Sequence, residues 1–509
     1  MRSILTILIL ILPTRIIFSQ QGFSQWIELG QESRFVGLTT SGHSLIAGGG
    51  IALENQPGAG LQIARIDTAG NVVHHFTLFD SLGTNYSFRD ECEVNQLQNG
   101  NYSITGDALE DLADIITVFD QNDDLVFHRE YPYEDNIQVR LPYRLISYEH
   151  GHIWLTADAF FDFDVDIGLH RIDPMGNKIW TTHFGVFNKN EIPSTIIQID
   201  NFFLIGGYRE TGSAPGSDGN IDCRQSWIFA VDSTGNKQWE WLGEPCSSEN
   251  VYGLQQTPDG GYIYLTRELE VYNPSDWGFA PKIVRRDADF NLLWERKLAD
   301  SYFETSYAYN LHPSPDGNWV AVGNTCLPEP CNPLSYPPGA EGVAIFLKVS
   351  DGGNQIWRTS VPTPNLSGTT FQPRIGGSVM IGSGSTFAAG SFRQQPPDEP
   401  TKSWAWLIKV DNNGCAETFC EPVATTAPLP PVPQLRVYPN PSPRIPVVFA
   451  SKNSLEGRLE IFDATGKRVL NQNVAFPFRW DTAHLPVGVY VYRVRLAAGT
   501  VSVGKVVLQ

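Results

Sequence analysis

Three aspartates in one short segment have the type and spacing needed for metal binding. Asp162, Asp164 and Asp166 alternate within residues 161–168, so an extended chain would place all three on one face. Hard cations such as Ca²⁺ prefer several carboxylate oxygens. We therefore take these aspartates as candidate Ca²⁺ ligands, with a solvated loop as the competing interpretation. No other cofactor is indicated.

The histidines and serines form no recognisable catalytic set. Residues 42–46 (GHSLI) lack the final glycine of the G-x-S-x-G nucleophile elbow. His150 and His152 are spaced like two metal ligands, but no third ligand is evident. A carboxylate pair for glycoside hydrolysis cannot be picked out among the 55 acidic residues. The sequence therefore assigns no catalytic residue and favours a protein that is not an enzyme.

A hairpin motif that recurs seven times must position any functional residue. Each copy has an apolar strand, a turn that starts at an acidic residue, and in most copies an aromatic on the returning strand. An aspartate there can accept hydrogen bonds from downstream amides, and glycine supplies the left-handed turn residue. The aromatic then packs against a neighbour. We interpret these residues as turn caps, not metal ligands: Asp67, Asp120, Asp173, Asp232, Asp287, Ser350 and Asp411.

A second hairpin precedes each copy, which gives four strands, A to D, in every repeat. Repeats of 53 to 63 residues with four strands are typical of β-propellers, so the sequence predicts an all-β, seven-bladed β-propeller over residues 21–420. The seventh copy lacks its D strand. Residues 24–30 (SQWIELG) resemble the D strand at 237–243 (KQWEWLG). We expect this N-terminal strand to complete the last blade and cover its edge.

The connections between strands B and C are long and dissimilar, whereas the A–B and C–D turns are short and repetitive. The predicted B–C loops include residues 208–225, 267–280 and 391–403. Variable loops on a rigid scaffold are where binding usually resides. We therefore predict a ligand-binding face on the side of the B–C loops, near the central channel. The candidate ligand-binding residues are Tyr208, Arg209, Trp277, Phe279, Tyr336, Phe392 and Arg393.

The N-terminal segment 1–20 is expected to be a signal peptide. Arg2 precedes an apolar run at 4–12, and Arg15 ends that run well short of the about 20 residues that a membrane span needs. Cleavage is predicted near Ser19 or Gln20, and an N-terminal membrane anchor is the alternative. No other stretch is apolar enough to cross a membrane. A proline-rich linker is predicted at 421–434.

Seven cysteines agree with an oxidising compartment. Three disulfides are predicted, with Cys92 left over. A thiolate zinc site is the alternative, but the chain has no C-x-x-C motif. The predicted pairs are Cys326 with Cys331, Cys415 with Cys420, and Cys223 with Cys246.

Residues 435–509 have strand and turn patterns that predict a small β-sandwich. Their signatures are Tyr438-Pro439-Asn440-Pro441 near the start, Gly488 and Tyr490 in LPVGVY, and Lys505 in KVV at the end. With these signatures the segment resembles the type A C-terminal sorting domain of the type IX secretion system; an ordinary adhesive sandwich domain is the alternative.

That resemblance implies a Bacteroidota-type bacterium and passage through the periplasm. It also implies recognition by the secretion machinery, and then release or attachment at the outer-membrane cell surface.

The formal net charge of −19 argues against nucleic acid as a partner. Both ends are basic, so residues 21–434 alone carry −27, which leaves cations, neutral glycans or basic proteins as partners. The first hypothesis is a non-enzymatic binding or adhesion module that contacts an extracellular glycan or protein. The alternative is an extracellular glycan-active hydrolase or lyase, which acidic residues with shifted pKa values gathered at the channel mouth would favour. A coat component without a discrete ligand is a third possibility.

Overall fold

The structure is a computed structural model of the 509-residue chain. It describes residues 22–27, 32–52, 59–78, 86–87, 93–108, 113–134, 136–149, 151–161, 164–216, 219–245, 250–273, 276–297, 307–327, 341–363, 370–371, 374–395, 402–416, 436–438, 442–443, 445–450, 456–463, 467–496 and 501–509. The chain divides into two compact units between Val423 and Ala424. Within the described ranges, no helix has the length and apolar character of a membrane span.

The first unit is all-β and consists of antiparallel sheets that follow one another along the chain, numbered here 1 to 7. Sheets 1 to 3 contain β2 (Glu32–Ser41), β3 (Ser44–Ala52), β4 (Ala59–Ile66) and β5 (Val72–Leu78); β6 (Tyr86–Ser87), β7 (Val94–Gln96), the short 3-10 helix η1 (Gln98–Gly100), β8 (Tyr102–Ala108), β9 (Ala113–Phe119) and β10 (Leu125–Pro132); and β11 (Ile137–Tyr148), β12 (Gly151–Phe160), β13 (Val165–Ile172) and β14 (Lys178–Phe184).

Sheets 4 to 7 repeat this arrangement. They contain β15 (Glu191–Ile199), β16 (Phe202–Gly216), β17 (Gly219–Asp232) and β18 (Lys237–Leu242); β19 (Tyr252–Gln256), β20 (Tyr262–Asn273), β21 (Asp276–Arg286) and β22 (Leu292–Lys297); β23 (Tyr307–Pro313), β24 (Trp319–Leu327), β25 (Glu341–Val349) and β26 (Gln355–Pro362); and β27 (Thr370–Phe371), β28 (Arg374–Met380), β29 (Thr386–Gln395), β30 (Lys402–Val410) and β1 (Phe23–Ile27).

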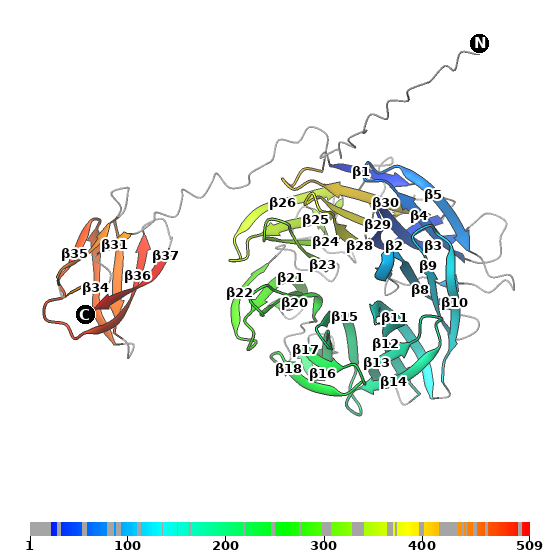
Figure 1. Cartoon of the computed structure of the whole chain (residues 1–509), viewed down its shortest axis with the longest axis horizontal. Coiled ribbons are helices and arrows are strands. Elements are labelled where there is room, and N and C mark those ends of the chain that lie inside the picture. Colours follow the sequence, from blue (N-terminus) through cyan, green and yellow to red (C-terminus); the bar gives the residue numbers. More distant parts are fainter. Residues whose placement is uncertain are drawn as a thin grey trace, which may run out of the picture. The chain divides into compact units, whose positions relative to one another are not determined.

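The sheets are arranged around a common centre, as Figure 1 shows. The strands nearest the centre contact one another from sheet to sheet. Their order is β2, β7, β11, β15, β19, β23 and β28, and β28 contacts β2 again. The N-terminal strand β1 pairs antiparallel with β30, with Trp26 opposite Trp406. The N-terminal strand therefore pairs with the last sheet as expected, but it runs from Phe23 to Ile27. Phe23, not Trp26, has the register position that Trp239 has in sheet 4, so the alignment of residues 24–30 with 237–243 was three residues out. The two ends of this unit are joined in one sheet.

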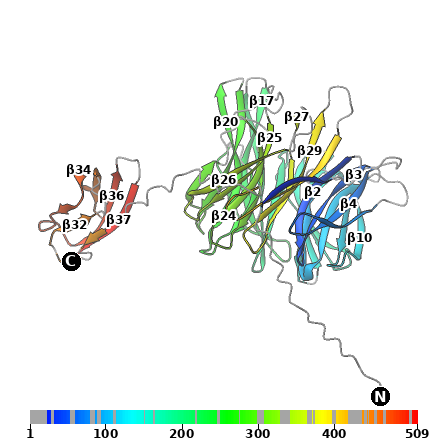
Figure 2. The same ribbon diagram turned by 90° about the horizontal axis from the view of Figure 1, so that it is seen from above.

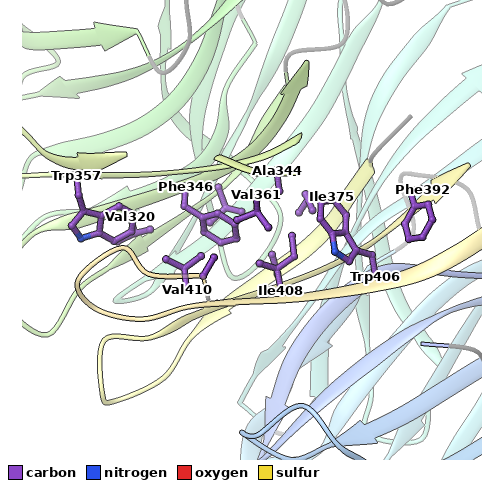
Figure 3. Packing of buried hydrophobic residues seen from close by; sticks show 13 residues of the cluster. Val320, Ala344, Phe346, Trp357, Val361, Ile375, Phe392, Trp406, Ile408 and Val410 are labelled. Atoms are coloured by element: carbon purple, nitrogen blue, oxygen red, sulfur yellow. The ribbon is translucent and has the colours of Figure 1, made fainter. Parts of the chain in front are cut away.

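The apolar core lies between neighbouring sheets, where the facing sides of two sheets share one cluster of buried residues. Figure 3 shows the cluster between sheets 6 and 7, in which Phe346 and Val361 of sheet 6 pack with Ile375 and Ile408 of sheet 7. The remaining boundaries have equivalent clusters, and Ile27 of β1 belongs to the one between sheets 7 and 1. Successive side chains point to opposite faces of a strand, so nearly continuous buried runs such as β9, in which all seven residues are buried, supply residues to both faces.

The repeated acidic residue caps the turn between the third and fourth strands, as predicted. In the third copy Asp173 Oδ1 accepts the N–H groups of Met175 and Asn177, both at 2.8 Å. The hydrogen bond from the Asn177 side chain is the main reason why the pKa of Asp173 is lowered. Ser350 caps its own turn through its hydroxyl oxygen, which accepts the Asn354 N–H at 3.0 Å. These residues therefore build the scaffold.

The repeated aromatic packs on the turn of the following sheet. The clearest case is Gly353, whose φ is +80°, beneath the ring of Trp294. A Cβ added to Gly353 would lie 2.7 Å from Trp294 Cδ2. The glycine is required both by its left-handed backbone and by the ring. The same contact recurs for the pairs Phe23 and Gly70, Phe127 and Gly176, Trp180 and Gly235, and Trp357 and Gly414.

The second unit contains a sheet of β31 (Arg436–Tyr438), β32 (Val447–Ala450) and β35 (Phe478–Trp480), and a second sheet of β34 (Arg468–Ala475), β33 (Glu456–Phe462), β36 (Gly488–Leu496) and β37 (Val501–Leu508). Phe449 and Trp480 of the first sheet share one core with Tyr492 and Val506 of the second. Ser442 N donates to Val507 O at 2.8 Å, which ties the start of the unit to its last strand.

Candidate functional site

Polar side chains cluster in sheets 2, 3 and 4. They lie near the ends of the second strands and the starts of the first strands. These ends lead into the B–C connections, where the sequence predicted binding. Figure 2 shows β17 and β20 reaching beyond their neighbours on one side of the unit. The predicted loop at 208–225 is mostly strand, because β16 continues to Gly216 and β17 starts at Gly219. The predicted loop at 267–280 is likewise the hairpin of β20 and β21.

The predicted ligand-binding residues do not form one exposed set. Phe392 is a correction, because it lies in β29 and is fully buried in the core between sheets 6 and 7. Tyr208 is also buried, with the guanidinium of Arg224 4.5 Å from its ring centre. Trp277 and Phe279 have their backbones in β21, and Arg393 in β29, while their side chains and all of Tyr336 lie outside the described residues.

Arg209 is the predicted residue that does belong to a polar site. Its Nε donates to Glu191 Oε1 at 3.1 Å, and the two residues are directly opposite each other on β15 and β16. Its guanidinium carbon lies 4.1 Å from the ring centre of Trp227, whose Nε1 donates to Glu240 Oε2 at 2.9 Å. We name Glu191, Arg209, Trp227 and Glu240 the Glu191 site.

The Glu191 carboxyl group is fully buried, although its Arg209 partner reaches solvent. Burial raises the pKa of Glu191 to about 7, Arg209 opposes that rise, and Asp166 and Asp164 add to it. A carboxyl group with a pKa near 7 exchanges its proton readily at neutral pH, which is the property required of a general acid or base.

Asp164 accepts two backbone hydrogen bonds through its carboxylate. Its Oδ2 accepts the Asn188 N–H at 3.1 Å, and its Oδ1 accepts the Lys189 N–H at 3.0 Å. Both oxygens are therefore used to hold the connection between sheets 3 and 4. Asp162 lies outside the described residues, and no cluster of metal-binding side chains occurs among the residues described. Cation binding by the three aspartates remains a prediction.

A second buried polar group lies between sheets 2 and 3 and is centred on Asp158. Arg140 Nε donates to Asp158 Oδ1 at 2.8 Å, and Arg140 and Asp158 are opposite each other on β11 and β12. The second oxygen of Asp158 lies 2.8 Å from His183 Nε2. The hydrogen bond from His183 and the charge of Arg140 outweigh burial and lower the pKa of Asp158. His183 is partly exposed, so this buried aspartate–histidine pair reaches the surface.

The same group contains an aspartate in an unusual state. Asp114 is fully buried, and its nearest cation is Arg140, with Nη1 3.6 Å from Oδ2. Burial raises the pKa of Asp114 well above its ordinary value, and the charges of Asp107 and Asp158 reinforce the rise. Burial therefore favours the neutral form of this carboxyl group. Like Glu191, Asp114 is a buried acidic residue at the start of its strand whose pKa is shifted upward.

The cysteines and the signature residues are placed as follows. Cys223 and Cys415 are disulfide-bonded and buried, and Cys326 has its backbone in β24. Cys92, Cys246, Cys331 and Cys420 lie outside the described residues, so the predicted pairing remains a prediction.

In the second unit Tyr438 and Lys505 are exposed, and the Tyr490 hydroxyl donates to Pro486 O at 2.9 Å. Gly488 starts β36 with a φ of +153°. Pro439, Asn440 and Pro441 lie outside the described residues.

Residues 436–509 match the family described as the secretion system C-terminal sorting domain. This match confirms the resemblance to the type IX sorting domain that was predicted for residues 435–509. Sorting domains of this family direct export to the cell surface or secretion. A comparison with curated proteins found no match.

Solved structures with a similar fold share little sequence with this chain. A polysaccharide lyase, Uly1, is 9% identical over 77% of this chain and 98% of its own, with a TM-score of 0.46. A puromycin hydrolase is 11% identical over 84% of this chain, with a TM-score of 0.43, and the chain spans 60% of that hydrolase. The β-propeller domain of the Trilobed protease from Pyrococcus furiosus is 11% identical over 76% and 98% of the two chains, with a TM-score of 0.39.

Proposed function

We propose that the first unit is a seven-bladed β-propeller that works outside the cell as a glycan-active hydrolase or lyase, delivered by the sorting domain. The signal peptide at 1–20 and the linker at 421–434 belong to the same proposal. So do the sandwich fold of the sorting domain and the Bacteroidota-type source. The observation that carries the proposal is the near-neutral pKa of the buried Glu191 next to Arg209.

The site favours catalysis over binding alone for a physical reason. A binding surface gains nothing from a carboxyl group held half-protonated at neutral pH, because burial of that group destabilises its charged form. Acid–base catalysis gains directly, because a group with a pKa near the working pH can both donate and accept a proton. Glu191 has such a pKa, and it is the first residue of β15, the strand of sheet 4 nearest the centre.

Each residue of the Glu191 site has a proposed role. Glu191 exchanges a proton with the glycan at the bond that is cleaved, a step that requires the contact between Val186 N and Glu191 Oε2 to open and admit the substrate. Arg209 is a positioning residue that fixes the Glu191 carboxyl through Oε1. Trp227 and Glu240 hold the guanidinium of Arg209 from its other side, through the ring contact at 4.1 Å and the ion pair at 3.6 Å. The strong acidity of residues 21–434 favours neutral over polyanionic glycans.

The test is turnover by the full mature chain on a panel of neutral oligosaccharides and polysaccharides. Cleavage is followed by product mass, because hydrolysis adds one water molecule for each bond cleaved whereas elimination adds none. We expect the wild type to cleave at least one member and Glu191→Gln to lose at least a hundredfold in kcat, since general acid–base catalysis contributes about 10² to 10⁴. Glu130→Gln, at an exposed position on β10, is the matched control. Binding of a glycan without cleavage would overturn the enzymatic proposal in favour of a binding module.

A further inference from the structure

Two strongly exposed aromatic side chains lie on either side of the Asp164 turn. Phe161 follows the end of β12 and is 62% exposed, and Phe187 lies between β14 and β15 and is 74% exposed. Val186 beside it is also exposed. Phe187 is the most exposed large apolar side chain among the described residues, and covering its ring and that of Phe161 with a partner would be favourable.

Asp164 connects the two segments that carry these rings. Its backbone oxygen accepts the Phe160 N–H at 2.8 Å, which closes the turn at Phe161. Its carboxylate accepts the N–H groups of Asn188 and Lys189, which follow Phe187 directly. We name residues 160–161, Asp164 and 186–190 the Asp164 bracket.

Further hydrogen bonds make the bracket rigid. Lys189 N donates to Val186 O at 3.0 Å, and Asn188 has a left-handed φ of +60°. The Asn190 side chain donates to Glu210 Oε2 at 2.7 Å, and Val165 pairs with Asn190 in a parallel bridge. A ring on such a segment is held in place before any ligand arrives, so binding orders little additional structure.

The bracket is also joined to the Glu191 site. Val186 N donates to Glu191 Oε2 at 3.4 Å, and Glu191 follows Asn190 in the chain. The oxygen of Glu191 that is not bound to Arg209 therefore faces the segment that carries Phe187. A molecule in contact with Phe187 would therefore lie next to the segment that covers the carboxyl group of Glu191, the proposed acid.

We infer that the Asp164 bracket is a stacking subsite for a neutral sugar ring, with Phe187 as its main platform and Phe161 as a second contact. The apolar C–H face of a pyranose ring matches the flat face of a phenylalanine, and Asn188 and Lys189, which follow Phe187, have polar side chains for its hydroxyls. The inference rests on the proposed function and adds the subsite and the uncharged substrate class. It also gives a role to Phe161, which lies in the segment whose aspartates were predicted to bind Ca²⁺.

The experiment measures kinetics and affinity on the same full-length protein. The variants are Phe187→Ala, Phe161→Ala and Phe187→Trp, with Phe202→Ala as the matched control, because Phe202 is an exposed phenylalanine at the opposite end of sheet 4. The probes are the neutral oligosaccharides that the wild type cleaves, and titration calorimetry gives the affinity. Melting temperatures within a few degrees of the wild type show that each variant is folded.

We expect Phe187→Ala to raise KM and the dissociation constant about fivefold, with a smaller rise for Phe161→Ala, since a stacked ring contact contributes about 1 kcal/mol. Phe187→Trp keeps wild-type affinity, Phe202→Ala has no effect, and kcat changes little in all four. Unchanged KM and affinity in Phe187→Ala, with activity still dependent on Glu191, would overturn the stacking subsite and leave the proposed function intact. Absence of turnover and of binding by the wild type would instead remove the proposed function.

Discussion

Arg209 and Glu191 are paired twice, as directly opposite residues on β15 and β16 and as a hydrogen-bonded ion pair of 3.1 Å. Despite that cation, burial raises the pKa of Glu191 to about 7. Desolvation therefore outweighs the attraction between the two charges, which is common when an ion pair is removed from water. Deprotonation of Glu191 should therefore destabilise the folded chain.

Stability should depend on pH through Glu191. Its pKa is higher in the folded chain, at about 7, than its ordinary value of 4.5, so the folded state binds the proton more tightly. The corresponding stabilisation is complete below pH 4.5 and is lost as the pH rises to 7, by about 3 kcal/mol in total. Unfolding by urea at several pH values should show Glu191→Gln gaining on the wild type across this range. An equal difference at pH 4.5 and pH 8 would contradict the shift.

The contact between Trp294 and Gly353 predicts a large cost for adding one methyl group. Gly353→Ala should destabilise the first unit by about 3 kcal/mol, through left-handed strain and collision with the ring. Gly317→Ala is the matched control, because Gly317 has a φ of +77° and no atom within 4 Å of an added Cβ. Gly317→Ala should lower the free energy of unfolding only by the cost of left-handed backbone strain, about 1 to 2 kcal/mol. Similar losses in both variants would show that the ring makes no difference.

Closure by the N-terminal strand predicts that a residue near the start of the mature chain stabilises the whole first unit. Ile27 is buried against residues of sheets 7 and 1, so Ile27→Ala should lower the free energy of unfolding by about 2 to 5 kcal/mol. Ser24→Ala removes the acceptor of the Trp406 Nε1 hydrogen bond at the exposed side of the same strand, and should cost about 1 kcal/mol. A change below 0.5 kcal/mol in Ile27→Ala would mean that β1 is not part of the core.

Export should depend on the sorting domain and not on the first unit. Removal of residues 436–509 should leave the protein folded in the periplasm, with none at the cell surface or in the medium. Trp480→Ala, in the core of the second unit, should reduce export by destabilising that unit while the melting of the first unit is unchanged. Cell fractionation with an antibody against the first unit measures both. Surface delivery of the truncated chain would contradict the role of this domain.

The repeat architecture could be predicted from the sequence because its determinants are local. An aspartate such as Asp173 accepts hydrogen bonds within four residues, and a glycine such as Gly353 is placed by the same short turn. The pairing of β1 with β30 was also predicted, from the resemblance of residues 24–30 to the strand at 237–243, but its register was not, because Phe23 and not Trp26 is equivalent to Trp239.

The candidate site could not be predicted, because its pairs depend on register. Glu191 and Arg209 are 18 residues apart, as are Arg140 and Asp158, and nothing local marks either pair. Opposite charges at that separation become informative only when the strand ends are known. Phe392 was misplaced for a related reason. It lies where β29 extends beyond its predicted end, and there it is buried by sheet 6.

The most direct test of the account is the pH dependence of kcat/KM for glycan cleavage, measured from pH 4 to pH 10. The account predicts a break near pH 7 in the wild type, from the Glu191 carboxyl, and its loss together with most of the activity in Glu191→Gln. A wild-type profile that is flat between pH 6 and pH 8, or a break near pH 7 that persists in Glu191→Gln, would contradict the assignment of Glu191 as the acid–base residue.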